Sequence, residues 1–417
     1  MSGTQVPAAS DIVTLADVEA ARDRLDGVVH RTPLDGSTTL AERCDAAAVG
    51  LKLENTQRTG SFKIRGAYSA MARLSGEERE RGVVAASAGN HAQGVALAGR
   101  LLGVDATIVV PRVTPAAKIE ATRGYGAEVV VEGESYEPAY EHALELRDRE
   151  GRTFVHPFDD RDVIAGQGTV GLELREQFDP DTVLVSIGGG GLISGVATAL
   201  KAHDSSVRVV GVQPEGAAHA GPSLERDAIH RLDEVDTVAE GIADARLLEK
   251  TFAVMRERVD SVVAVTDTDL AVATTLLAER AKTVAEAAGA APVAALLSDA
   301  VDVAGERVAC VVSGGNTNLS DHADLTRVGL MALDRYVEAR LALRGWPTSV
   351  GDVTETVEAE GAELDVLERA RPAAADDPNR TPVRIGLEGS DAEHLASVLA
   401  ALDDRPALTV VDHSLDE

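Results

Sequence analysis

The chain has 417 residues, enough for two or three domains with substantial cores, and a formal net charge of −29 at pH 7. This acidic balance argues against nucleic acid and anionic membranes as partners, because both require basic patches. Arginine supplies nearly all the positive charge, with only six lysines, and the acidic residues are spread along the chain, which resembles the surfaces of proteins from salt-rich cytoplasm.

The two cysteines, Cys44 and Cys310, have neither metal-site spacing nor a disulfide framework, and we expect both to pack as small apolar groups. The first residues are small and polar, with Asp11 soon after, so we expect no signal peptide. No stretch approaches the roughly 20 apolar residues that a membrane helix needs. We therefore expect a soluble, cytoplasmic protein that makes no membrane contact.

The N-terminal part begins with an expected loose tail over residues 1–10. Thr14 and Asp17 have the spacing of a capping box, which predicts a helix that runs to about Leu25. Residues 49–53 form a short predicted strand, and a helix is expected from Ser61 to about Leu74.

From residue 82 onward, strands alternate with helices. Near-continuous Val and Ile runs between helices are typical of parallel sheets buried on both faces, and two such sets indicate two α/β units with a cleft between them. The predicted strands cover residues 83–87, 106–111, 128–131, 153–156, 182–186, 207–212 and 308–312. The predicted helices cover residues 92–102, 115–125, 138–150 and a stretch after Gly191.

The composition changes near residue 330. The following chain predicts strands at residues 335–343, 363–368, 382–388 and 407–411, helices at 349–360 and 391–402, and a loop at 371–380. This βαββαβ order is the ferredoxin-like pattern of a small separate α+β domain.

Residues 54–67 contain Lys63 between Gly60-Ser61 and Gly66-Ala67. Glycines and small residues let the backbone approach a flat ligand closely. A buried, deprotonated lysine in such a place can form a Schiff base with a carbonyl cofactor. The alternative is a surface lysine at the start of a helix whose N-cap is Ser61.

Three further segments follow predicted strands. Residues 87–94 read Ser-Ala-Gly-Asn-His-Ala-Gln-Gly, where backbone N–H groups at a helix start can bind an anion and Asn90 can both donate and accept. The alternatives are a plain turn with Asn90 as the helix N-cap and a purely structural His91. Residues 313–316 read Ser-Gly-Gly-Asn, and they place Ser313 where a strand end meets a ligand crevice. The alternative is an ordinary glycine-rich turn between a strand and a helix.

The third segment is a run of four glycines, Gly188, Gly189, Gly190 and Gly191, before Leu192. Bare backbone amides at a helix start suit a phosphate group. The run is not a P-loop, because no Gly-Lys-Ser/Thr follows, and its spacing to Gly195 is one residue too long for a dinucleotide fingerprint. A flexible linker is the alternative.

Together, these segments resemble the fold-type II pyridoxal phosphate enzymes, most closely the threonine dehydratase (threonine ammonia-lyase) family, over about residues 10–330. Residues 213–217, 238–242, 259–260 and Thr266 also fit the family's run. The resemblance implies two α/β domains with pyridoxal 5′-phosphate at their interface, within a catalytic domain of residues 1–330. Residues 60–165 would form its smaller, mobile part.

The resemblance also implies roles for the motif residues. Lys63 would bind the cofactor covalently and act as the base on the substrate Cα, with Phe62 packed nearby. Asn90 would bind the cofactor's 3′ oxygen. The ring nitrogen would face Ser313, whose hydroxyl gives little reason for that nitrogen to stay protonated, which suits β-elimination better than transamination. Two runs would contribute backbone or side-chain donors: Gly188, Gly189, Gly190, Gly191 and Leu192 to the phosphate, and Ser87, Ala88, Gly89, Asn90 and His91 to the substrate carboxylate.

The implied activity is the conversion of L-threonine to 2-oxobutanoate and ammonia, and of L-serine to pyruvate, in isoleucine biosynthesis or threonine catabolism. Rival readings are a serine or hydroxyaspartate dehydratase or racemase, and a non-catalytic amino-acid sensor. Serine racemases of the family carry a serine where this chain has Ala88, which favours one-base elimination. Some relatives use an acid for a cation where this chain has Gln213, so we expect no metal.

Residues 331–417 resemble an ACT domain, a regulatory module that binds amino acids as effectors. Regulated relatives often read Asp-Arg-Pro-Gly in the first loop, where this chain has residues 344–347, Arg-Gly-Trp-Pro. The alternative is a module that only mediates oligomerisation. We expect a homo-oligomer, a dimer or a tetramer.

Overall fold

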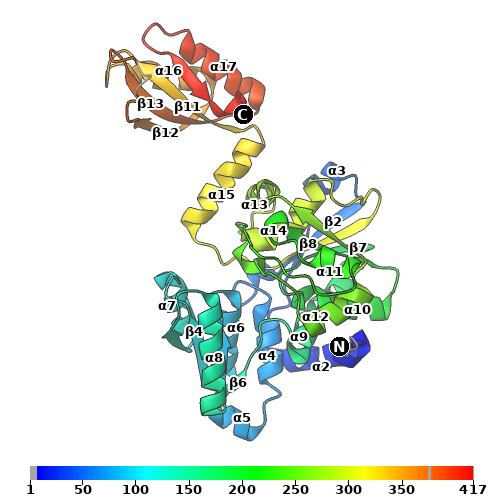
Figure 1. Ribbon diagram of the computed structural model, residues 1–417. Helices are drawn as coiled ribbons and strands as arrows, with labels where there is room; N and C mark the ends of the chain where they lie inside the picture. Colours follow the sequence, from blue (N-terminus) through cyan, green and yellow to red (C-terminus); the bar gives the residue numbers. More distant parts are fainter. Residues whose placement is uncertain (1–6, 374–376, 417) are drawn as a thin grey trace. The chain divides into compact units, whose positions relative to one another are not determined.

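The computed structural model describes residues 7–373 and 377–416. The chain separates into two compact units, Met1–Leu319 and Ser320–Glu417 (Figure 1). Helix α15 (Leu319–Ala332) begins at this division, and the predicted boundary near residue 330 falls close to its end. Within the described ranges, no helix combines the length and the apolar character that crossing a membrane requires.

The first unit contains a six-stranded sheet in the order β1-β2-β10-β7-β8-β9. All neighbouring strands are parallel except the edge strand β1, which is antiparallel to β2. The strands are β1 (Leu34–Gly36), β2 (Ala48–Leu53), β7 (Thr182–Ser186), β8 (Arg208–Pro214), β9 (Ser261–Val265) and β10 (Arg307–Val312). The predicted parallel, buried sheet is confirmed, although β1 and β9 were not anticipated.

A second sheet in the same unit has four parallel strands in the order β5-β4-β3-β6. They are β3 (Val83–Ala86), β4 (Ala106–Val110), β5 (Glu128–Val131) and β6 (Thr153–Phe154). Alternate residues of β3 enter different cores: Val83 and Ala85 pack with helices α4 and α6, whereas Val84 and Ala86 pack with α8. Helices thus cover both faces, which is why every residue of β3 is apolar and buried.

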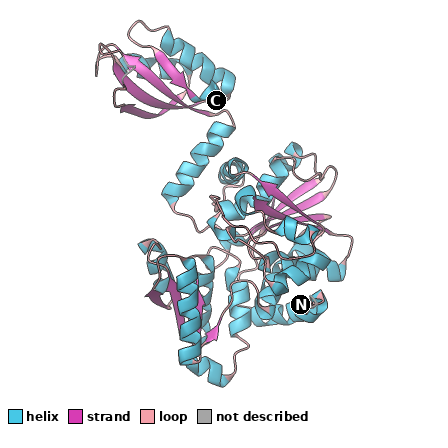
Figure 2. Ribbon diagram, viewed as in Figure 1, coloured by secondary structure: helices cyan, strands magenta, loops and turns pink. Residues whose placement is uncertain are grey.

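Helices connect and cover these sheets (Figure 2). In the first unit they are α1 (Ala9–Ile12), α2 (Leu15–Leu25), α3 (Thr38–Arg43), α4 (Lys63–Met71), α5 (Gly76–Arg81), α6 (Asn90–Leu102), α7 (Ala116–Gly124), α8 (Tyr136–Glu150), α9 (Arg161–Gln177), α10 (Gly191–His203), α11 (Ala220–Glu225), α12 (Glu249–Arg258), α13 (Asp267–Arg280) and α14 (Ala287–Leu297). Short 3₁₀ turns are η1 (Glu54–Thr56), η2 (Glu215–Ala217) and η3 (Glu240–Ile242).

The N-terminal expectations have mixed outcomes. The capping box of α2 is confirmed, because Thr14 Oγ1 accepts from the Asp17 N–H and the Asp17 carboxylate accepts from the Thr14 N–H. The loose tail is wrong where it can be checked: α1 begins at Ala9, whose side chain is buried. Residues 1–6 lie outside the described ranges.

The second unit has the predicted βαββαβ order. Its antiparallel sheet runs β12-β13-β11-β14, with strands β11 (Tyr336–Leu343), β12 (Glu363–Arg369), β13 (Thr381–Glu388) and β14 (Val410–His413). Helices α16 (Val350–Glu360) and α17 (Ala392–Asp403) lie on one side of this sheet (Figure 2), and η4 (Ser414–Asp416) ends the unit. Alternate β11 residues and apolar residues of both helices form a core of the unit's own.

Candidate active site

The lysine loop, residues 54–62 before Lys63, and the Ser313 loop, residues 313–316, are joined by backbone hydrogen bonds. The parallel neighbours β2 and β10 both end just before these loops, so both chains leave the sheet at the same edge. Phe62 N–H donates to Ser313 O at 3.2 Å, and Gly315 N–H donates to Gly60 O at 2.9 Å, around a bridge between Ser61 and Gly314. Such an edge, at the carboxyl ends of parallel strands, is where open α/β sheets bind ligands.

Lys63 is the first residue of α4. The N-cap is Phe62, with no side-chain cap bond, so the alternative with Ser61 as N-cap is wrong. The Ser61 backbone forms the bridge with Gly314, and its buried hydroxyl has no hydrogen-bond partner. Lys63 Nζ donates to Pro157 O at 3.0 Å and lies 5.2 Å from the Phe62 ring centroid. Burial lowers the Lys63 pKa to about 8, against the opposing pull of the Asp244 and Glu286 carboxyls. A nucleophilic lysine needs such a shift.

The segment that receives the lysine is held from both sides. His156 Nδ1 accepts from the backbone N–H groups of Phe158 at 3.2 Å and Asp159 at 2.8 Å. Asp159 in turn accepts from two backbone N–H groups in the first turn of α12. Burial, with help from Lys250 and Lys63, lowers the His156 pKa to about 4, so its imidazole is neutral at pH 7. This bracing fixes Pro157 O and the Phe158 ring.

The four-glycine turn connects β7 to α10. Every residue from Gly188 to Leu192 is buried, and Gly190 has φ +85°, a conformation that favours glycine. A Cβ on Gly189 would overlap the Phe158 ring, and one on Gly191 would lie 2.9 Å from Phe158 Cβ. No side chain caps the N-terminus of α10, so its first backbone amides are not taken by a cap. Leu192 places its side chain in the core of the large sheet, which leaves only its backbone for a ligand.

The Asp244 carboxyl lies beside this turn. Its Oδ2 is 2.6 Å from the position of a Cβ on Gly188, so a larger residue there would displace this carboxyl group. Burial raises the Asp244 pKa, while Lys63 and the Gly189 N–H oppose the shift. Lys63 and the glycine turn therefore share two neighbours, the Pro157-Phe158 segment and Asp244.

Residues 87–91 form the turn between β3 and α6. Helix α6 begins at Asn90, two residues earlier than predicted, and its N-cap is Gly89, so the alternative with Asn90 as N-cap is wrong. The Gly89 N–H donates to Ser87 Oγ at 3.3 Å, and Ala88 is half-buried. A Cβ on Gly94 would lie 3.1 Å from the Lys63 backbone carbon, so α6 passes directly against the start of α4.

His91 is buried, and its Nε2 lies 2.9 Å from Val155 O. Because a backbone carbonyl only accepts, Nε2 carries the hydrogen. Burial, with a smaller effect of Lys63, lowers the His91 pKa to about 3. This imidazole is neutral and paired, which favours the structural reading of its side chain and leaves its backbone N–H for a ligand.

Asn90 Nδ2 donates to Glu286 Oε1 at 2.7 Å. Burial raises the Glu286 pKa to about 7, and the Asn90 bond, Lys118 and Lys63 hold it lower than burial alone would. Glu286 immediately precedes α14, and its backbone N–H donates to Gly314 O at 3.1 Å.

The structure thus brings the Lys63, Asn90 and Ser313 segments into one hydrogen-bonded group. The glycine turn packs against Phe158, and the neighbouring Pro157 O accepts from Lys63. The sequence reasoning missed Phe158, Asp244 and Glu286. None lies in a glycine-rich turn after a strand, and each reaches the site through long-range packing, so no local pattern could have found them.

The residue discussed as a departure from a cation site, Gln213, makes two backbone hydrogen bonds. Its Nε2 donates to Ile187 O at 3.3 Å and its Oε1 accepts from Ala220 N–H at 2.7 Å. Among the residues that the structure describes, no cluster of three His, Cys, Asp or Glu side chains could hold a metal ion.

The chain belongs to the family of pyridoxal-phosphate dependent enzymes, whose sequence profile matches residues 25–314. An L-threonine ammonia-lyase of Thermotoga maritima is 44% identical over 388 residues, which cover 93% of this chain and 96% of that protein.

Two solved structures have the same fold. The processed form of threonine deaminase isoform 2 from Solanum lycopersicum is 39% identical with a TM-score of 0.72, covering 75% of this chain and 92% of that chain. A serine racemase from maize is 36% identical with a TM-score of 0.73, covering 77% of this chain and 99% of that chain. The expected fold-type II architecture and pyridoxal phosphate dependence are confirmed.

Proposed function

We propose that this protein deaminates L-threonine to 2-oxobutanoate and ammonia, and L-serine to pyruvate. The observation that carries the proposal is the Lys63 amine, whose pKa burial lowers to about 8 and which shares the Pro157-Phe158 segment with a turn of buried glycines. The choice of substrate rests on the similarity to the threonine ammonia-lyase of Thermotoga maritima over 93% of this chain.

The residues at this site fit pyridoxal phosphate. The turn from Gly188 to Leu192, with uncapped amides where α10 begins, suits its phosphate, and Lys63 supplies an amine for its aldehyde. The Asn90 amide would bind its 3′ oxygen, Phe62 would pack nearby, and the Ser313 hydroxyl would face its ring nitrogen. When bound, the cofactor supplies an electron sink that makes the substrate Cα–H bond acidic.

Backbone and side-chain donors of Ser87 to His91 would hold the substrate carboxylate at the N-terminus of α6. The Lys63 amine, with its pKa near 8, can accept the Cα proton at neutral pH and return it afterwards. Pro157 O, which accepts from Lys63 Nζ, would keep the amine oriented while it holds a proton. These roles require no metal ion.

Racemisation needs a second proton donor on the opposite face of Cα. In racemases of this family that donor is a serine at the position of Ala88, and a methyl group cannot supply a proton. We therefore propose a dehydratase over a serine or hydroxyaspartate racemase. Measuring product chirality with L-serine tests this choice: D-serine formation at a rate comparable to pyruvate formation would reverse it.

Replacement of Lys63 tests the enzyme proposal against the amino-acid sensor alternative. Lys63→Ala should abolish threonine turnover and the visible absorbance of the cofactor-loaded protein, whereas Lys282→Ala, at an exposed lysine, should change neither. Turnover by the Lys63→Ala protein contradicts the assignment. A wild-type protein that binds threonine without turnover favours the sensor.

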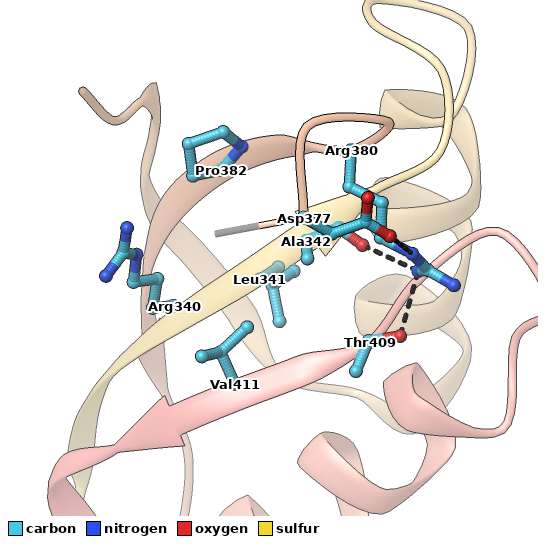
Figure 3. Close-up of a pocket in the computed structure, with 8 residues that line it drawn as sticks. All are labelled: Arg340, Leu341, Ala342, Asp377, Arg380, Pro382, Thr409 and Val411. Carbon is cyan, nitrogen blue, oxygen red and sulfur yellow. Dashed lines mark hydrogen bonds and ion pairs between the residues drawn. The ribbon is translucent and has the colours of Figure 1, made fainter. Parts of the chain in front are cut away.

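For the second unit we propose an amino-acid effector site. A pocket of about 250 Å³ lies beside β11, β13 and β14, with Arg340 and Arg380 at opposite ends (Figure 3). Arg380 donates to Ala342 O at 3.1 Å and to Thr409 Oγ1 at 2.8 Å, and Asp377 lies 3.9 Å away. A guanidinium and a carboxylate are complementary to the two charges of an amino acid. The pocket is lined by Arg340, Leu341, Ala342, Asp377, Arg380, Pro382, Thr409 and Val411.

Calorimetric titration of the full chain with isoleucine, and assays of threonine turnover with and without it, test this site. Binding that Asp377→Asn weakens supports it, and isoleucine inhibition would favour a biosynthetic role over a catabolic one. Absence of binding by isoleucine, valine and threonine leaves oligomerisation as the unit's role. We further propose a cytoplasmic homo-oligomer, a dimer or tetramer, which light scattering tests.

A further inference from the structure

A chain of side-chain hydrogen bonds runs through Asn90 and connects three loops of the first unit. Asn316 Nδ2 donates to Thr59 O at 2.7 Å and to Asn90 Oδ1 at 2.6 Å. Asn90 Nδ2 then donates to Glu286 Oε1 at 2.7 Å. The proposed roles above use Asn90 alone and leave Asn316 and Glu286 without a function.

The direction of this chain follows from its first partner. Thr59 O is a backbone carbonyl and only accepts, so the nitrogen end of the Asn316 amide faces it. The same nitrogen lies against the Asn90 side chain, so Asn90 presents its oxygen there. Its nitrogen then faces Glu286, which accepts through a carboxyl oxygen. One carbonyl thus fixes the orientation of two amides.

Two glycines make room for the chain. A Cβ on Gly60 would overlap Oδ1 of Asn316, and a Cβ on Gly314 would overlap Oε1 of Glu286. The paired lysine and Ser313 loops therefore carry glycine at the two points where these side chains pass. A further contact, from Asn316 Nδ2 to Gln93 Oε1 at 3.5 Å, extends the group to α6.

We propose that Asn316 and Glu286 are positioning residues that hold the Asn90 amide in one orientation, with a nitrogen-bound hydrogen available to the 3′ oxygen of pyridoxal phosphate. The inference rests on the proposed function, because it takes Asn90 as the partner of that oxygen. The Asn90 nitrogen has two hydrogens, of which Glu286 receives one. If the amide were reversed, its oxygen would face the 3′ oxygen and two acceptors would repel each other.

Asn316→Asp preserves shape and removes the donor. Residue 316 would then offer only acceptors to Thr59 O and Asn90 Oδ1, so the Asn90 amide should reverse. Glu286→Leu removes the acceptor at the other end and should release the amide. Glu286→Gln is the rescuing variant, because its amide oxygen can still accept from Asn90. Asn55→Asp is the matched control. Asn55 Nδ2 donates to Thr283 Oγ1 at 2.6 Å and to Val284 O at 2.8 Å, and neither bond belongs to the hydrogen-bond series through Asn90.

The experiment titrates each purified cofactor-free protein with pyridoxal phosphate and records affinity and the absorbance spectrum. A hydrogen bond to the 3′ oxygen affects the balance between the visible and near-ultraviolet bands, which a purely structural role would leave unchanged. Asn316→Asp and Glu286→Leu should each shift that balance and weaken binding about tenfold, as expected for one lost buried hydrogen bond. Glu286→Gln and Asn55→Asp should match the wild type in both quantities.

Melting curves of the cofactor-free proteins establish that each variant is folded, and the Glu286 pair provides an independent comparison if Asn316→Asp is not. Unchanged spectra in Asn316→Asp or Glu286→Leu overturn the inference, as does an equal shift in Asn55→Asp. A wild-type protein that acquires no visible band rejects the proposed function itself, so the two failures are distinguishable.

Discussion

At the scale of single residues, the site contains ionisable groups whose pKa values differ from their ordinary values. Lys63 holds its proton less tightly than a lysine in water, and Glu286 holds its proton more tightly than a glutamic acid in water, both chiefly because of burial. Each displacement costs stability in the cofactor-free protein.

The first prediction concerns Lys63→Met in the cofactor-free protein. The folded-state pKa is near 8 and the unfolded value is near 10.4, so Lys63 binds its proton more tightly in the unfolded chain than in the folded protein. The lysine therefore destabilises the folded state progressively as pH falls from 10 to 8. Lys63→Met should raise the free energy of unfolding at pH 7 by roughly 1–2 kcal/mol, allowing for partial solvation, and by little at pH 10. Denaturant titrations at both pH values check this, and a less stable variant at pH 7 contradicts it.

The second prediction concerns the pH dependence due to Glu286. Its folded pKa of about 7 lies above its unfolded value of 4.5, so the wild type loses stability as pH rises between them. Glu286→Gln removes this loss. The difference in unfolding free energy between variant and wild type should grow by roughly 2 kcal/mol from pH 4.5 to pH 7.5. Glu80→Gln, at an exposed position, should show no such trend, and a flat difference for Glu286→Gln would refute the assignment.

At the scale of elements, the glycine turn depends on how α10 packs against α9. A Cβ on Gly195 would overlap Ile164 O and lie 2.8 Å from Gly168 Cα, while a Cβ on Gly168 would lie 2.8 Å from Gly195 O. The two helices therefore touch backbone to backbone. Because α10 begins at the glycine turn, we expect this contact to influence the position of that turn.

The third prediction follows from this contact. Gly195→Ala should separate the two helices and lower the free energy of unfolding by about 1–3 kcal/mol or more. Weaker pyridoxal phosphate binding should accompany the loss. Gly351→Ala in α16 has no atom near its Cβ and should be neutral or stabilise by up to about 1 kcal/mol. Thermal melting checks both variants, and equal effects of the two would contradict the packing argument.

Except for β9, the parallel strands could be predicted, because they are short runs rich in Val and Ile that are bounded by turn residues. Helices α9, α13 and α14 could not. Helix α14 is apolar throughout and contains Pro292, so it has no polar face that a helical period would show. The middle of α9 is buried and carries three glycines, which disfavour a helix in sequence-based prediction. These helices are enclosed by the rest of the unit, and their surroundings decide their conformation.

The same distinction applies to the site. Lys63, Asn90, the glycine turn and Ser313 all follow strands, where local sequence identifies a ligand edge. Asp244 and Glu286 belong to segments whose partners are distant in sequence, and Asn316 was visible only as part of a motif. A local pattern indicates which backbone N–H groups are available to a ligand. The charged side chains around them are brought there by the tertiary fold.

At the scale of the molecule, the two units have separate cores. The matched region makes up 92% of the chain in the structure of the processed threonine deaminase isoform 2 from Solanum lycopersicum.

The fourth prediction is that residues 1–319, produced alone, fold and retain threonine turnover. The reason is that every contact described for the site lies within this unit. Values of kcat/KM within about threefold of the full chain, with any response to isoleucine abolished, are the expected result. Steady-state assays and circular dichroism of both proteins check it. A folded but inactive truncated protein would show that catalysis depends on residues 320–417.

A self-contained core in Ser320–Glu417 also has an engineering consequence. The strands and helices of this unit bury one another's apolar side chains. Such a module can be fused to another enzyme, or exchanged for a related module, without changes to the core of that enzyme. Chimaeras joined at the start of α15 should therefore transfer the effector site that we propose for this unit while leaving each catalytic unit intact.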